Sequence, residues 1–140
     1  MDPVDSPRPR DFNRGFSGFT DKQIGIIDFY NRKFDRTISE LQLFEGLVPI
    51  GKRKYKFVST FASECINEVA EHIIKSSNAD IGIVVNLKSD RVSFRKAREV
   101  EFDLSALAEK ISQGGGHKYA AGGQICDTFL AFTKMLSPVK

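Results

Sequence analysis

The chain has 140 residues, of which 41% are hydrophobic and 28% charged, and its formal net charge is +3. This composition is that of an ordinary globular protein, long enough to bury about two-thirds of the surface of its unfolded chain. It excludes a membrane-spanning protein, because no apolar run reaches about 18 residues, and the small positive charge is compatible with a nucleic-acid ligand without indicating one.

The N-terminal third is predicted to contain an arm and one long helix. Residues 1–19 are rich in Pro, Arg and Gly without periodicity, which predicts a disordered arm. Thr20 and Gln23 have the spacing of a capping box, which predicts a helix start. The segment that follows has apolar residues at steps of three and four, typical of an amphipathic helix: Ile24, Ile27, Tyr30, Phe34, Ile38 and Leu41. We assign 20–50 to this helix and a linker.

The following part, 51–140, is predicted to form one domain. Gly46, Pro49 and Gly51 interrupt the chain before a strand at 54–58. Next come a helix over 64–75, with Ser63 as its N-cap, and a buried strand over 81–86, followed by a turn at Ser89-Asp90.

The strand predicted over 91–95 places Arg91, Ser93 and Arg95 on one face, because side chains alternate along a strand. Asp103 is expected to cap a short helix, and a last strand at 124–127 precedes a closing helix capped by Asp127. The predicted fold class is therefore α/β, with a mixed sheet of about four or five strands flanked by helices and preceded by the long amphipathic helix.

A basic run with an aromatic residue lies at 52–56, where Lys52, Arg53 and Lys54 precede Tyr55. It has two interpretations: a nucleic-acid groove, or an edge strand whose lysines discourage pairing with another sheet. We favour the edge strand. Tyr119 is likewise either a base-stacking residue or a packing residue.

The most informative motif is the glycine run that ends in a histidine, residues 114–117. Three consecutive glycines let several N–H groups point at one oxygen-rich ligand, and a helix starting directly afterwards would add its dipole. His117 adds a ring N–H at the rim, or a charge at mildly acidic pH. The pattern indicates a phosphate or carboxylate site, and the alternative is a flexible turn beside a surface histidine. Ser93 and Arg95 could converge on the same phosphate.

The order and spacing of these predicted helices, strands and motifs, from about 59 to 125, resemble those of the C-terminal DHH-associated domain of the DHH phosphoesterase superfamily. This superfamily includes RecJ-type exonucleases and nano-RNases. The resemblance implies an α/β substrate-binding domain for nucleotides or short oligonucleotides. It implies that the ligand-binding residues are Ser93, Arg95, Gly114, Gly115, Gly116 and His117, with Lys96 and Lys118 as accessory contacts. Gln113 and Lys96 depart from the family's glycine and serine at those positions.

The superfamily's catalytic domain binds two divalent metals, expected to be manganese, through aspartates and histidines. The chain has two histidines, His72 and His117, and neither adjoins an aspartate. We therefore expect no metal and no catalytic centre in this chain, only in a partner catalytic domain. The alternative is a non-catalytic subunit of a larger, RNA-containing or organellar assembly that the helix region 20–44 would contact.

The cysteines, Cys65 and Cys126, lie far apart without metal-binding spacing, which is typical of an intracellular protein. The cytoplasm and the mitochondrion are not distinguished by the sequence.

Overall fold

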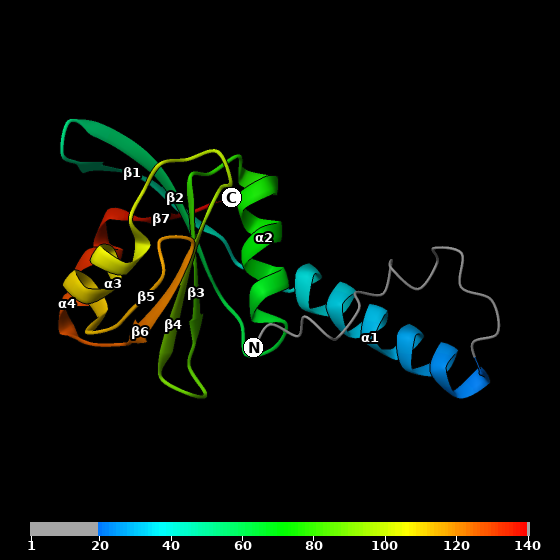
Figure 1. Ribbon diagram of the computed structural model, residues 1–140. Coiled ribbons are helices and arrows are strands. Elements are labelled where there is room, and N and C mark those ends of the chain that lie inside the picture. Colours follow the sequence, from blue (N-terminus) through cyan, green and yellow to red (C-terminus); the bar gives the residue numbers. More distant parts are fainter. Residues whose placement is uncertain (1–19, 140) are drawn as a thin grey trace. The chain divides into compact units, whose positions relative to one another are not determined.

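The computed structural model describes residues 20–139 (Figure 1). The arm predicted at 1–19 lies outside these residues. The described chain divides between Glu40 and Leu41 into two compact units. The first contains helix α1 (Asp21–Ser39), and its predicted capping box is present: Thr20 accepts a hydrogen bond from the Gln23 backbone, and Gln23 accepts one from the Thr20 backbone. No residue of α1 is buried.

The second unit is a mixed sheet between two layers of helices. Its strands are β1 (Phe44–Ile50), β2 (Arg53–Phe61), β3 (Ile81–Asn86), β4 (Arg91–Lys96), β5 (Gly115–Gly116), β6 (Ala120–Gln124) and β7 (Ser137–Pro138), in the spatial order β5-β6-β4-β3-β2-β1-β7. Only β2 and β3 among these neighbours run parallel. The α/β class with a mixed sheet is confirmed, but the seven strands exceed the four or five predicted.

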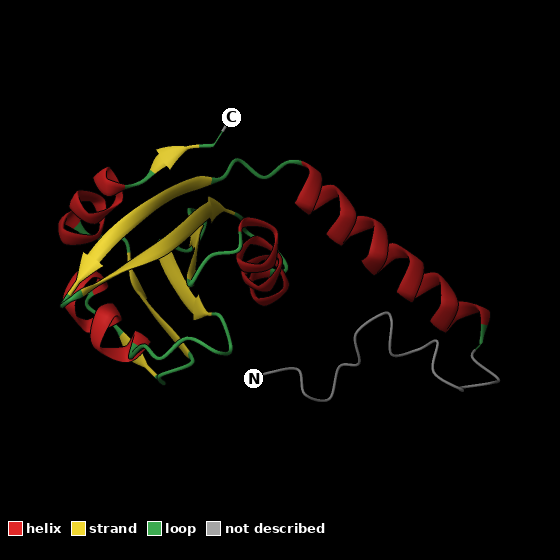
Figure 2. Ribbon diagram, turned by 90° about the horizontal axis from the view of Figure 1, so that it is seen from above, coloured by secondary structure: helices red, strands yellow, loops and turns green. Residues whose placement is uncertain are grey.

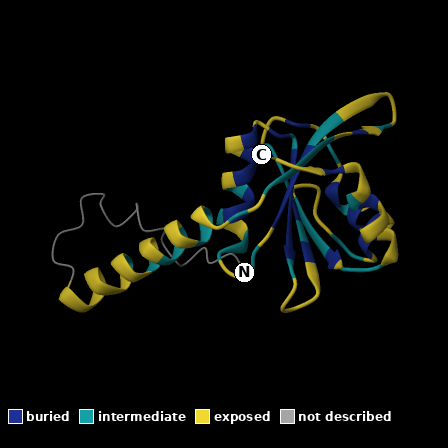
Figure 3. Cartoon of the chain, turned by 180° about the vertical axis from the view of Figure 1, so that it is seen from behind, coloured by how far each residue is buried: buried dark blue, intermediate teal, exposed yellow. Residues whose placement is uncertain are grey.

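The helices of the second unit are α2 (Ile66–Ser77), α3 (Leu104–Ser112) and α4 (Asp127–Phe132), and a 3-10 turn, η3 (Thr133–Met135), follows α4. Helix α2 lies on one face of the sheet, while α3 and α4 lie on the other (Figures 1 and 2). The main core fills the space on the α3 side, where Phe57, Ile83, Phe94 and Phe129 are nearly inaccessible to solvent. Figure 3 shows this burial along the central strands, with exposed residues at the helix surfaces and turns.

Three strands, β1, β5 and β7, were missed because they depend on pairing rather than on local pattern. Pro49 was expected to interrupt the chain, yet it lies in β1, exposed, and it pairs only with β2, because β7 reaches no further along β1 than Glu45. A proline is tolerated on the unpaired side of an edge strand because no ladder hydrogen bond is needed there. Strand β7 has two residues and no periodicity to detect.

Two predicted helix caps were wrong. Helix α2 begins after Cys65, which has left-handed backbone (φ 54°) and no side-chain cap, so Ser63 is not its N-cap. Helix α4 begins at Asp127 with Cys126 as N-cap, and the strand expected at 124–127 ends at Gln124. In contrast, Asp103 caps α3 as predicted, since its carboxylate accepts a hydrogen bond from the Ala106 backbone at 3.2 Å.

Candidate functional site

The glycine run forms a β-hairpin and not the start of a helix. Gly115 and Gly116 make up β5, residues 117–119 form the turn, and β6 follows. The His117 N–H donates to the Ala120 carbonyl at 2.9 Å and closes the hairpin. The helix that could have started directly after the glycines is therefore not formed, because a hairpin at the edge of the sheet occupies its place. No helix dipole acts on a ligand there.

Two of the three glycines are required by close backbone packing. A Cβ on Gly114 would collide with the Gly122 carbonyl oxygen. A Cβ on Gly116 would lie 2.8 Å from the Ala120 carbonyl oxygen, and its φ of +145° is one that other residues rarely adopt. Gly115 differs, because its nearest neighbours would be Glu109 and Ser105 side-chain atoms at 4.0 Å. The run is thus first a packing device, because it lets the glycine segment lie close to the backbone of β6.

The sheet register brings the predicted ligand-binding residues into two adjacent rows. Ser93 of β4 pairs with Gly122 of β6, which pairs with Gly115 of β5. In the next row Arg95 pairs with Ala120, whose carbonyl accepts the His117 N–H.

Directly paired residues share one face of a sheet, so Ser93 and Arg95 lie with Gly122 and Ala120 on the face that carries α2. The rows are about 6.6 Å apart and each spans about 10 Å. A serine hydroxyl, a guanidinium and the end of the glycine hairpin are therefore close enough for one phosphate-containing ligand to contact.

Four of these side chains have no competing partner within residues 20–139. The side chains of Ser93, Arg95, His117 and Lys118 make no hydrogen bond or ion pair there, and His117 and Lys118 are exposed. Cationic and polar groups that the fold leaves uncommitted can accept an anion without first breaking an internal contact. These groups are therefore available to a ligand.

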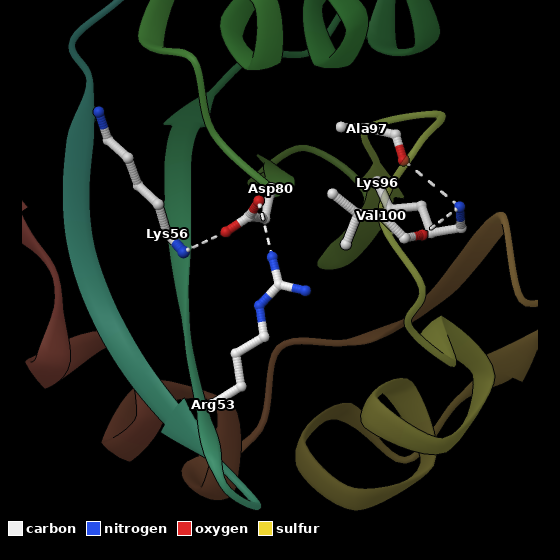
Figure 4. A network of polar contacts seen from close by, with 6 residues as sticks. All are labelled: Arg53, Lys56, Asp80, Lys96, Ala97 and Val100. Atoms are coloured by element: carbon white, nitrogen blue, oxygen red, sulfur yellow. Dashed lines mark hydrogen bonds and ion pairs between the residues drawn. The ribbon is translucent and has the colours of Figure 1, made fainter.

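Lys96 is committed to the fold instead. Its Nζ donates to the backbone carbonyls of Ala97 at 3.3 Å and Val100 at 2.7 Å (Figure 4). It also donates to a third carbonyl, that of Arg98, at 3.4 Å. It also lies 5.1 Å from the centre of the Tyr119 ring, a cation–π distance. Lys96 therefore fixes the loop after β4 and lies against the turn of the hairpin.

Metal-binding residues are not gathered in the part of the chain that the structure describes: no three His, Cys, Asp or Glu residues there could hold one ion. The two-metal centre of the superfamily does not fit these residues. None of the helices in residues 20–139 has the length and apolar character that a membrane span requires.

An apolar cavity of about 230 Å³ was not predicted from the sequence. It lies at the other end of the sheet from Arg95, and its walls include Phe44, Phe61, Val85 and Phe129 without any charged side chain. Its residues come from six separate elements and the segments between them, so no local motif could have indicated it. A phosphate has no charged partner in this cavity.

The sequence profile of the DHHA1 domain family matches residues 54–137. Among solved structures, the chain is similar to a pGpG-specific phosphodiesterase, PggH, from Vibrio cholerae (15% identity, TM-score 0.53), over 82% of this chain and 40% of that one. It is also similar to an uncharacterized protein from Helicobacter pylori G27 (20% identity, TM-score 0.46), over 78% and 28%. An exopolyphosphatase-related protein from Bacteroides fragilis aligns over 92% and 38% (13% identity, TM-score 0.47). The chain thus spans well under half the length of these proteins, and no curated protein sequence matches it.

Proposed function

Because the chain belongs to the DHHA1 domain family, which the DHH phosphoesterases share, we propose that it binds the phosphate groups of nucleotides or short oligonucleotides as the substrate-binding module of such an enzyme. The observation that carries the proposal is the register that aligns Ser93 and Arg95 with the glycine hairpin. The Arg95 guanidinium binds a phosphate oxygen, and the Ser93 hydroxyl donates to a second phosphate oxygen or to a sugar hydroxyl.

The hairpin supplies the remaining contacts. Hydrogen-bonded and non-hydrogen-bonded pairs alternate in an antiparallel ladder, and His117 is at a hydrogen-bonded position. We therefore expect the Gly116 N–H to point away from β6 toward the open edge, where a phosphate can accept it. The imidazole of His117 donates from the turn beside it. Hydrolysis is left to a metal-bearing catalytic domain outside the described residues, since these hold no suitable ligand cluster.

The test is calorimetric titration of the chain with a 5′-phosphorylated nucleotide. Arg95→Ala and His117→Ala each remove a charge-assisted contact of about 1.5–3 kcal/mol, so each is expected to weaken binding about tenfold or more. Both side chains lack partners within residues 20–139, so the melting temperature should change little. Arg36→Ala, an exposed arginine of α1, removes the same charge elsewhere and should leave binding unchanged. Wild-type affinity in both site variants would refute the proposal.

A second candidate function is supported by α1. Its apolar residues follow a helical spacing, none of them is buried, and Ile24, Ile26 and Phe29 are among the exposed large side chains. Such a helix is suited to contact a DHH catalytic domain or another subunit of an assembly. Polar substitutions at Ile27, Phe34 and Ile38 should then release the chain from a complex in native mass spectrometry. A complex that survives these substitutions would exclude this role for α1.

A further inference from the structure

One end of the sheet collects positive side chains from three separate segments. Because β3 runs parallel to β2 and antiparallel to β4, the start of β2, the end of β4 and the turn of the β5–β6 hairpin meet at the same end, opposite the β3–β4 turn (Figure 1). Seven lysines and arginines lie there against four acidic residues, an excess of three positive charges. The cations are Lys52, Arg53, Lys54, Arg95, Lys96, Arg98 and Lys118, and the acids are Asp80, Glu99, Glu101 and Asp103.

Contacts between side chains connect these segments into one surface. The Arg53 guanidinium lies 4.6 Å from the centre of the Tyr55 ring, and this ring packs edge-on against Phe102 with 4.9 Å between centroids. Two residues after Phe102, the Leu104 N–H donates to the Lys118 carbonyl at 3.3 Å. These contacts connect the tip of the β1–β2 hairpin to the turn of the glycine hairpin.

The basic run at 52–54 lies where β2 is paired on one side only, which agrees with the edge-strand interpretation of the sequence. Strand β2 pairs with β1 from Arg53 to Ser59, but with β3 only from Phe57 to Phe61. Lys52 and Lys54 are exposed and have no ion pair within residues 20–139. Arg53 pairs with Asp80 at 3.7 Å and still has 55% of its side chain exposed (Figure 4). No strand pairs with Arg53 and Lys54 on the β3 side, so their side chains keep this edge open to solvent and available for a ligand.

An exposed aromatic ring lies at the glycine-hairpin end of this surface. Tyr119 is 70% exposed, an unusual exposure for a large ring, and the Lys96 ammonium lies over its centre at 5.1 Å. Lys96 is itself fixed by three carbonyls, so the ring is supported by a rigid group. A fixed, exposed ring beside cations is the arrangement on which the bases of single strands stack.

We propose that this surface, defined by Lys52, Lys54, Arg98, Lys118 and Tyr119, binds the backbone and bases of a single-stranded oligonucleotide whose terminal phosphate occupies the Arg95 site. The proposal rests on the proposed function. From β2 to β5 the sheet spans four strand spacings, or about 19 Å. At about 3.4 Å per stacked nucleotide this distance corresponds to about six nucleotides. The preferred ligand is therefore longer than a mononucleotide or dinucleotide.

The test is a series of 5′-phosphorylated single strands of one, two, four, six and eight nucleotides, titrated at several salt concentrations. Wild-type affinity should increase with length at least tenfold and level off near six. The double variant Lys52→Ala/Lys54→Ala should lose most of this gain and bind the mononucleotide unchanged. For the six-nucleotide strand, its slope of log K against log salt should decrease by about 1.4, because each lost single-strand phosphate contact contributes about 0.7.

Two further variants make the test specific. Lys88→Ala/Lys134→Ala removes two exposed lysines outside this surface and should retain the length dependence. Tyr119→Ala should weaken the longer strands about fivefold or more through lost stacking. Equal affinity at all lengths, or a normal length dependence in Lys52→Ala/Lys54→Ala, would overturn the inference.

The two proposals fail in different ways. A mononucleotide that binds through Arg95 without any gain on lengthening refutes the extended surface alone. A gain on lengthening that Arg95→Ala leaves untouched, with no binding of the mononucleotide, refutes the phosphate site alone.

Discussion

Replacing Gly116 and Gly115 by alanine in turn tests whether the glycine run is a packing device. In Gly116→Ala, the new methyl group would lie 2.8 Å from the Ala120 carbonyl oxygen and from the Ala121 Cα, both backbone atoms, on a residue with φ +145°. An unfavourable backbone conformation costs about 1–3 kcal/mol and overpacking a further 1–3 kcal/mol. We expect a loss of about 3 kcal/mol or more in the free energy of unfolding.

Gly115→Ala should behave differently although it is the adjacent residue. Its methyl group would meet Glu109 and Ser105 side-chain atoms at 4.0 Å, an ordinary contact. Alanine also restricts the unfolded chain, which favours the folded state by about 0.4–1 kcal/mol where the conformation is allowed. The expected change in unfolding free energy is thus within about 1 kcal/mol of zero.

The assay is urea unfolding of the two variants beside the wild type, followed by circular dichroism. For a unit of about 100 residues, 3 kcal/mol corresponds to a melting temperature about 12–24 °C lower, so thermal melts give a second readout. Gly114→Ala, whose methyl would collide with the Gly122 carbonyl, should resemble Gly116→Ala. Equal losses at Gly115 and Gly116, or a fully stable Gly116→Ala, would refute the steric reasoning.

Three other changes have defined outcomes. Lys96→Ala removes the donor to three carbonyls, including Val100, and should lower the free energy of unfolding in urea by about 2–3 kcal/mol. Hydrogen exchange in the loop after β4 should become faster, and unchanged exchange would contradict this role. Asp80→Ala leaves the Lys56 N–H without its 2.8 Å acceptor and should cost about 1–3 kcal/mol, whereas Asp80→Asn keeps an acceptor oxygen and should cost less than half as much. Gly25→Ala, with nothing within 4 Å of its new methyl, should stabilise α1 by about 1 kcal/mol, seen as greater helix content; a loss of helix would contradict the open surroundings.

The elements that were predicted correctly are those whose signal is local. The capping box at Thr20 and Gln23 starts α1, and Asp103 caps α3, because a cap depends on residues three positions apart. The buried strand at 81–86 has the predicted bounds, since a short run of β-branched residues between turn residues is typical of a central strand. The short strands and the cap at Cys65 had no such signal.

The sequence by itself determined the family and the residue types of the candidate site, because Ser93, Arg95 and the glycine run lie in short motifs whose spacing is conspicuous without any folding. Only the tertiary structure decided how these residues are used. The register of β4, β6 and β5 aligns them in two rows, and it assigns two of the glycines to packing and Lys96 to the loop.

The basic end of the sheet could not be predicted from the sequence either. Lys54 and Lys118 are 64 positions apart, and only strand pairing brings them to the same end. Local motifs depend on neighbours along the chain, whereas a binding surface depends on which distant segments the hydrophobic core holds together.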